Sequence, residues 1–82
     1  MYKNRAPDGK NNLCGGRVAA LRIAKVPKLS QRGLADLLQI KGLDVDKNAV
    51  QRIESGQRFV TDIELKALAE ALGVTVEDLL ER

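Results

Sequence analysis

The feature that most constrains this chain is a pattern of helix starts that occurs four times. In each, a side chain able to cap a helix follows one apolar residue and precedes another by four positions, as in a hydrophobic staple. The four caps are Ser30, Asp46, Thr61 and Thr75, and their apolar partners are Leu29 with Leu34, Val45 with Val50, Val60 with Leu65, and Val74 with Leu79. No run with the two-residue alternation of a strand appears in the sequence. We therefore expect an all-α fold.

Apolar residues that recur three and four positions apart set the extent of the helices. Pro27 ends the first helix, and Gly56 and Gly73 stand where left-handed C-terminal residues are needed. A chain of 82 residues has room for one modest core. The sequence therefore predicts a compact five-helix domain with helices at Arg17–Lys25, Gln31–Ile40, Lys47–Ser55, Asp62–Leu72 and Val76–Glu81.

Residues 1–16 are polar and interrupted by Pro7, Gly9, Gly15 and Gly16. We interpret them as a flexible, basic N-terminal arm, and residues 17–82 as the domain. Cys14 in this arm is the only cysteine of the chain, so no disulfide framework can form within the chain. Cys14 is either a redox-sensing thiol or a partly buried, incidental residue.

The composition excludes several kinds of chemistry. The sequence contains no His, so one chain cannot assemble a Cys/His zinc site or a His-based proton shuttle. No acid pair, Ser/Lys dyad or phosphate-binding glycine loop stands at a convincing spacing. The longest apolar run, Val18 to Leu21, is far shorter than the roughly 18 residues of a membrane span. We expect a cytoplasmic protein without catalytic residues, metal or cofactor, and without membrane contact.

Charge is distributed unevenly along the chain. Residues 1–41 contain nine basic and two acidic residues, whereas residues 42–82 contain five basic and nine acidic ones. Such an asymmetry indicates one side that faces a polyanion and another that faces solvent or a partner.

Two charged residues stand at inward positions of their helices. Glu54 follows Ile53 directly, and Arg22 follows Leu21 in the same way. Because an unpaired buried charge is unfavourable, we expect a bidentate ion pair between Arg22 and Glu54 that joins the first helix to the third. The alternative is that each side chain extends separately to solvent.

The opposite face of the third predicted helix carries only hydrogen-bonding residues and no acid. Arg and Lys read guanine in a major groove, and Asn and Gln read adenine. Lys47, Asn48, Gln51 and Arg52 are therefore candidates for base reading, although an ordinary solvated helix has the same appearance. Beside them, the candidates for phosphate contacts are Gln31, Arg32, Ser55, Gln57 and Arg58.

Two helices joined by a turn, the second with a base-reading face, follow the helix-turn-helix plan. The residues that carry the pattern are Leu21-Arg22, Leu29-Ser30-Gln31, Leu34-Ala35, Leu38, Val50, Arg52-Ile53-Glu54, Gly56, Arg58, Leu65, Leu68-Ala69, Leu72-Gly73-Val74 and Leu79. In this combination the chain resembles, over about residues 16–82, the Cro/phage-repressor (lambda-repressor-like, or XRE) family of helix-turn-helix proteins.

The resemblance implies a dimeric transcriptional repressor. By this resemblance, Gln31 contacts a phosphate and braces the third helix. Base contacts fall to Lys47, Asn48 and Arg52. Arg22 and Glu54 correspond to the internal ion pair of the family. Three features depart from the family. The segment 39–45 between the two helices is about five residues longer than usual, and we expect Leu43 and Val45 to hold it on the core. Gly33 replaces a common capping glutamate, and the connection through Val26-Pro27-Lys28 is also longer.

We therefore expect a sequence-specific regulator that binds double-stranded DNA, as a homodimer, through the helix at about 47–55. One alternative is an antitoxin that regulates its own operon and binds a protein partner. Another is a protein-interaction module that does not read DNA. The last helix, with Val76, Leu79 and Leu80, is a candidate for the dimer contact. The basic arm either enters a minor groove beside the main site, as some helix-turn-helix arms do, or is simply disordered.

Overall fold

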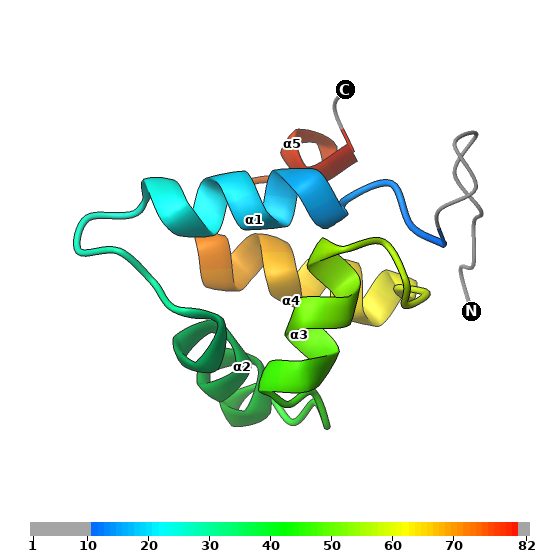
Figure 1. Ribbon diagram of the computed structural model, residues 1–82, viewed down its shortest axis with the longest axis horizontal. Coiled ribbons are helices and arrows are strands. Elements are labelled where there is room, and N and C mark those ends of the chain that lie inside the picture. Colours follow the sequence, from blue (N-terminus) through cyan, green and yellow to red (C-terminus); the bar gives the residue numbers. More distant parts are fainter. Residues whose placement is uncertain (1–10, 81–82) are drawn as a thin grey trace.

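The computed structural model describes residues 11–80, which form five helices and no strand. The helices are α1 (Gly15–Ala24), α2 (Gln31–Ile40), α3 (Lys47–Glu54), α4 (Asp62–Leu72) and α5 (Val76–Leu80). Helix α1 lies across α4 with α5 at one side, while α2 and α3 form the opposite part of the molecule, with α3 crossing in front of α4 (Figure 1). The expected all-α fold is confirmed.

All four helix caps are present. The side chains of Ser30, Asp46 and Thr61 accept hydrogen bonds from the third backbone N–H of α2, α3 and α4. Glu64 completes a capping box at Thr61. At α5, Thr75 Oγ1 accepts from the Asp78 N–H at 3.1 Å, and Asp78 Oδ2 accepts from the Thr75 N–H at 3.1 Å. Each cap contributes about 1 kcal/mol to stability.

The helix bounds agree with the expected ones except at α1 and α3. The expected bounds of α2 and α4 are confirmed. Helix α3 ends one residue early because Ser55 is its C-cap, and Gly56 follows with a φ of 82°. Helix α1 ends at Ala24 and begins at Gly15, so the expected start at Arg17 is wrong by two residues. The predicted end of α5 at Glu81 lies outside the described residues.

Helix α1 begins at Gly15 because of contacts made by Asn12 and Ile53, which the sequence pattern around Gly15 and Gly16 did not reveal. Asn12 Oδ1 accepts a hydrogen bond from the Gly15 N–H at 2.8 Å and so satisfies an amide at the helix start. A Cβ at Gly15 would collide with the carbonyl oxygen of Ile53, so only glycine allows α1 to approach α3 this closely. Residues 11–14, assigned to the arm with residues 1–10, contact the helical core, while residues 1–10 lie outside the described part.

The core draws on every helix. Its largest fully buried side chains are Cys14, Val18, Leu34, Leu38, Val45, Val50, Ile53, Leu68 and Leu79. The long connection between α2 and α3 is held on this core. Val45 is buried, Leu43 packs against the buried residues, and Gln39 Nε2 donates to the Val45 carbonyl at 3.2 Å. The expected role of Leu43 and Val45 is confirmed, and the turn is an ordered part of the domain.

Candidate nucleic-acid interface

Helix α3 has a buried apolar face and an exposed polar face. Ala49, Val50 and Ile53 are buried against the rest of the domain. The four residues expected to read bases all point away from that core and are exposed; they are Lys47, Asn48, Gln51 and Arg52. A helix that is anchored along one side and exposes four polar side chains along the other can enter a major groove without unfolding.

The ion pair between Arg22 and Glu54 fixes α3 against α1. Arg22 Nε donates to Glu54 Oε2 at 2.7 Å, and Arg22 Nη2 donates to Glu54 Oε1 at 3.1 Å. The side chains are only 11% and 8% exposed. Arg22 Nη1 also donates to the Leu29 carbonyl at 3.0 Å. This is the inward, bidentate pairing expected from the sequence, and it ties the connection before α2 to the same network.

Gln31 joins α2 to this network. Its Nε2 donates to Glu54 Oε1 at 2.9 Å, so one carboxylate connects the first turn of α2 with α3 and α1. Gln31 therefore makes a contact of the bracing kind that the family resemblance implies. A part-buried hydrogen bond beside an ion pair restricts the angle between the two helices.

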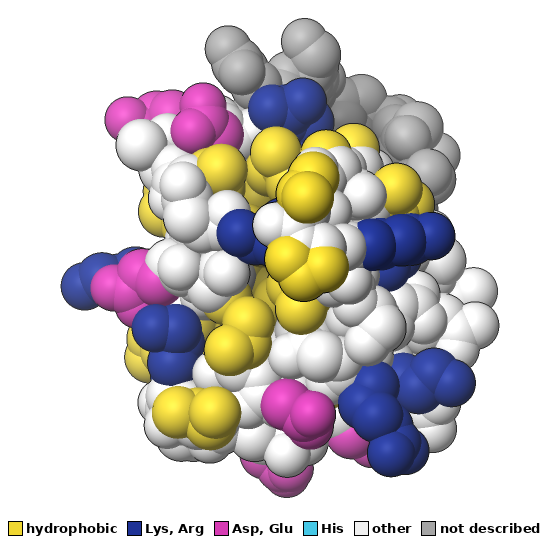
Figure 2. All heavy atoms as spheres, turned by 90° about the vertical axis from the view of Figure 1, so that its left-hand side faces the viewer, with side chains coloured by type: hydrophobic (Ala, Val, Ile, Leu, Met, Phe, Trp, Pro, Cys, Tyr) yellow, Lys and Arg dark blue, Asp and Glu magenta, His cyan; other side chains and the backbone are white. Residues whose placement is uncertain are grey.

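A hollow beside the starts of α2 and α3 collects basic side chains. Its lining residues are Arg22, Lys28, Ser30, Gln31, Arg32 and Lys47, and no acid is among them. A second hollow continues between α2 and α3 and is lined by Arg32, Ala35, Asp36, Gln39, Asp46, Lys47 and Asn48. Arg32 and Lys47 border both. Figure 2 shows Lys and Arg side chains gathered at the lower right of the molecule. This surface suits a polyanion.

The structure gives Arg58 a protein partner. Its Nη1 and Nη2 donate to the two carboxylate oxygens of Glu64, both at 3.0 Å. Burial raises the pKa of Glu64, but the hydrogen bonds from Arg58 and from the Thr61 N–H outweigh it and hold that pKa below its usual value. Arg58 thus stabilises the start of α4, a role that the sequence analysis missed because it considered Arg58 only as a phosphate contact.

The remaining phosphate candidates differ in exposure. Arg32, Ser55 and Gln57 are exposed, whereas Gln31 and Arg58 are partly buried. The Ser55 hydroxyl donates to the Arg52 carbonyl at 3.2 Å and so closes the end of α3. Lys28, which borders the basic hollow, was not among the predicted residues. Lys28 lies in the connection between α1 and α2, where the sequence has no helical periodicity from which the direction of its side chain could be predicted.

Asn11 and Asn12 also escaped the sequence analysis. Asn12 is only 7% exposed, and its side chain bonds to backbone groups more than forty residues away. The only local signal was an asparagine three residues before Gly15, the arrangement of a helix cap, which the two glycines made unconvincing.

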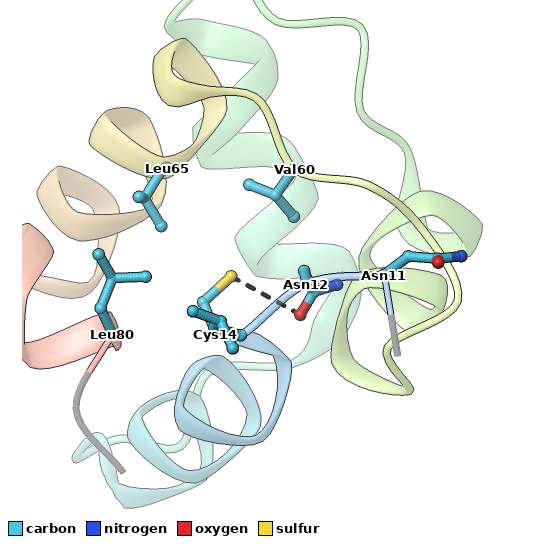
Figure 3. A pocket seen from close by; sticks show the side chains of 7 residues that line it. Asn11, Asn12, Cys14, Val60, Leu65 and Leu80 are labelled. Atoms are coloured by element: carbon cyan, nitrogen blue, oxygen red, sulfur yellow. Dashed lines mark hydrogen bonds between the residues drawn. The ribbon is translucent and has the colours of Figure 1, made fainter. Parts of the chain in front are cut away.

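Cys14 lies in the core beside these asparagines. It lines a small cavity with Val60, Leu65 and Leu80, and its sulfur points into the space between these side chains (Figure 3). Burial raises the pKa of the Cys14 thiol from 9.0 to about 11. Because thiolate chemistry requires the deprotonated form, a buried, incidental residue fits the geometry better than a redox sensor.

Residues 11–80 contain no group of three His, Cys, Asp or Glu side chains arranged to hold a metal ion. None of their helices is long and apolar enough to cross a membrane.

Residues 14–82 match the family model of a helix-turn-helix domain. The chain belongs to this helix-turn-helix domain family. The match spans all five helices, and α2 and α3, joined by residues 41–46, are the two helices that the sequence analysis expected to form the motif. No curated protein matches the chain, and no solved structure does either.

In helix-turn-helix proteins the second helix of the motif enters the major groove. The exposed polar side chains of α3 and the basic hollow at the starts of α2 and α3 are neighbours on the surface, since Lys47 belongs to both.

Proposed function

We propose that this helix-turn-helix domain is a sequence-specific regulator of transcription, a repressor of the Cro/phage-repressor type that binds double-stranded DNA and has no enzymatic activity of its own. The observation that carries the proposal is the exposed polar face of α3 next to a hollow lined by cationic residues and no acid. A cytoplasmic site of action agrees with this function.

Base reading belongs to four residues of α3: Lys47, Asn48, Gln51 and Arg52. Arg52 and Lys47 are suited to the acceptor atoms of guanine, and Asn48 and Gln51 to the acceptor and donor of adenine. All four are exposed and lie on the same side of a helix that the core holds in place. We expect each good contact to discriminate against a wrong base by about 1–3 kcal/mol.

Phosphate binding belongs mainly to Arg32 and Gln57, which are exposed at opposite ends of the α3 surface. Gln31 and Ser55 supply further polar contacts. Arg58 can bind a phosphate only when its guanidinium leaves Glu64, because the two side chains together form a neutral pair. Contacts of this kind fix orientation on the duplex without reading sequence.

Two copies are needed to recognise a site of useful length, because one short helix reads only a few base pairs. Leu79 is fully buried and unsuitable for a dimer contact, whereas Val76 and Leu80 are half-buried on the same helix. We assign the homodimer contact to this end of the molecule.

The experiment that tests the proposal is selection of randomised duplex DNA by the purified protein, at near-physiological salt, with sequencing of the bound pool. We expect an inverted repeat whose half-sites are separated by about one helical turn. The Arg52→Ala variant should relax preference at one base pair, while the matched control Lys66→Ala, an exposed residue of α4, should select the wild-type sequence. A folded protein that enriches no sequence would overturn the proposal.

A protein partner is the second candidate, as in an antitoxin or an interaction module. It is favoured by exposed apolar side chains outside the α3 surface, in particular Ile23, Val26 and Ile40, which are 51%, 97% and 82% exposed. Figure 2 shows hydrophobic side chains on the side that carries the α1–α2 connection. Loss of binding to a co-expressed partner on Val26→Asp, with DNA selection intact, would support this role.

A further inference from the structure

The loop after α3 brings an acid of α4 to the edge of the candidate DNA surface. This loop, residues 55–61, runs from the C-terminal end of α3 to the start of α4 (Figure 1). Glu64, in the first turn of α4, lines a hollow together with Arg52, a candidate base contact, and Gln57, a candidate phosphate contact. The basic hollow at the starts of α2 and α3 has no acid in its lining. The two ends of α3 therefore present different charges to a DNA backbone.

Arg58 is the cation that Glu64 binds at this end. Its Nη1 and Nη2 donate to the two carboxylate oxygens at 3.0 Å each, and the side chains of Arg58 and Glu64 are 27% and 16% exposed. Among residues 11–80, the exposed cations of the same surface form no ion pair; they are Arg32, Lys47 and Arg52. Because the pair is neutral and occupies both Nη atoms of Arg58, a phosphate must compete with Glu64 for this charge.

The helix cap holds the Glu64 carboxylate in place. Its Oε1 accepts from the Thr61 N–H at 3.1 Å, and the Glu64 N–H donates to Thr61 Oγ1 at 3.2 Å. Burial disfavours the charged form, yet the hydrogen bonds from Arg58 and Thr61 keep the pKa of Glu64 below its usual value, so the carboxylate is charged at neutral pH. Arg58 therefore has a fixed, charged partner within the protein before any DNA arrives.

We propose that Glu64 is a positioning residue for DNA binding, which holds the Arg58 guanidinium on α4 and so withholds one cation from the phosphates beside the C-terminal end of α3. The inference rests on the proposed function, since it requires that α3 faces DNA. It removes Arg58 from the phosphate contacts expected from the sequence and leaves that end of the surface to the neutral Gln57. Substitution of Glu64 by a neutral residue converts Arg58 into a phosphate contact.

The test is a double-mutant cycle on the salt dependence of DNA affinity. It compares the wild type, Arg58→Ala, Glu64→Gln and the double variant on the duplex that the wild-type protein selects. Glutamine can still complete a capping box, so Glu64→Gln removes the charge and keeps the helix start. The matched control is Glu70→Gln, which removes an acid of the same helix from an exposed pair with Lys41. Melting curves establish that each variant is folded at the assay temperature.

We expect Arg58→Ala alone to leave the slope of log K against log salt unchanged. Glu64→Gln should steepen that slope by about 0.9, the value of one added phosphate contact, so that its affinity falls about 3.5-fold more than that of the wild type between 50 and 200 mM salt. Arg58→Ala in the Glu64→Gln background should remove this added slope, and Glu70→Gln should keep the wild-type slope. A merely structural role of Glu64 would change the melting temperature and not the slope.

Two results would overturn the inference. One is a slope that Arg58→Ala alone reduces by about 0.9, since Arg58 would then contact a phosphate in the wild-type protein. The other is the same slope for Glu64→Gln and the wild type. Failure of the proposed function has a different signature, because the wild-type protein itself would then select no duplex. The two failures are therefore separable in one set of measurements.

Discussion

At Glu54, one carboxylate holds three helices together. It accepts two hydrogen bonds from the Arg22 guanidinium and a third from Gln31, and its side chain is 8% exposed. Since the two charges are withdrawn from water together, neither partner can be removed without leaving the other unpaired in the core. The geometry of the α3 surface therefore depends on this residue.

Glu54→Ala should lower the free energy of unfolding by about 3–5 kcal/mol, because it leaves the Arg22 guanidinium buried and unpaired. Thermal and urea denaturation followed by circular dichroism would measure the loss. Glu70→Ala is the matched control: its pair with Lys41 has side chains 54% and 35% exposed, and an exposed pair contributes no more than about 1 kcal/mol. Equal losses for the two variants would contradict the structural role of Glu54.

Arg58→Ala should lower the free energy of unfolding by about 1 kcal/mol at pH 7, because Glu64 loses its bidentate partner at the start of α4. Glu64 has a lowered pKa in the folded state, so its contribution is present above the ordinary value of 4.5 and is lost as pH falls through the folded value. The difference between wild type and variant should therefore shrink below about pH 4.5. Denaturant titrations from pH 7 to pH 3 measure it, with Gln57→Ala as a control that leaves stability unchanged.

At the scale of helices, contacts between residues close in sequence could be predicted, whereas some contacts between residues far apart in sequence could not. The caps Ser30, Asp46 and Thr61 were predictable because each bonds to a residue three positions away. The hydrogen bonds of the Asn12 side chain could not be predicted, because their acceptors lie 41 and 46 residues further along the chain. The inward direction of Arg22 and Glu54 did follow from helical spacing, as did the outward face of α3. The partner of Arg58 depended on how the loop after α3 folds.

Substitution of two neighbouring glycines, Gly15 and Gly16, tests how closely α1 approaches α3. Gly15→Ala should destabilise the domain by about 1–3 kcal/mol, because the new methyl group meets the Ile53 carbonyl oxygen and the backbone must move. Gly16→Ala should leave stability unchanged or raise it by up to about 1 kcal/mol, since nothing lies within 4 Å of the added Cβ and alanine favours a helix. Urea midpoints of the two variants give the comparison, and a stable Gly15→Ala protein would contradict this packing.

For the molecule as a whole, folding turns the uneven charge of the sequence into two differently charged regions. The cations Lys28, Arg32 and Lys47 meet at one hollow, whereas α4 and α5 carry Asp62, Glu64, Glu70, Glu77 and Asp78. In the proposed function, we expect a duplex to be attracted to the cations of this hollow and repelled by the acids of α4 and α5, which would orient the encounter before any base is touched.

The proposed dimer makes a prediction about spacing. A duplex with the selected inverted repeat should bind two chains, and insertion of five base pairs between the half-sites should reduce affinity at least about tenfold, because the half-sites then face opposite sides of the helix. Stoichiometric titration by fluorescence anisotropy, with sedimentation to count chains, measures both quantities. Two chains that bind the spaced and unspaced sites equally would show that no dimer contact forms.

Because α3 is short, we expect the lifetime of the protein in the cell to depend on whether a DNA duplex is bound to it. A helix of eight residues does not persist in water by itself, so the reading surface exists only while Val50 and Ile53 remain in the core. A duplex bound to that surface therefore withdraws chains from the unfolded population that proteases degrade. Chains on their operator should outlive free ones, and the cellular supply of this protein would follow the number of sites available to it.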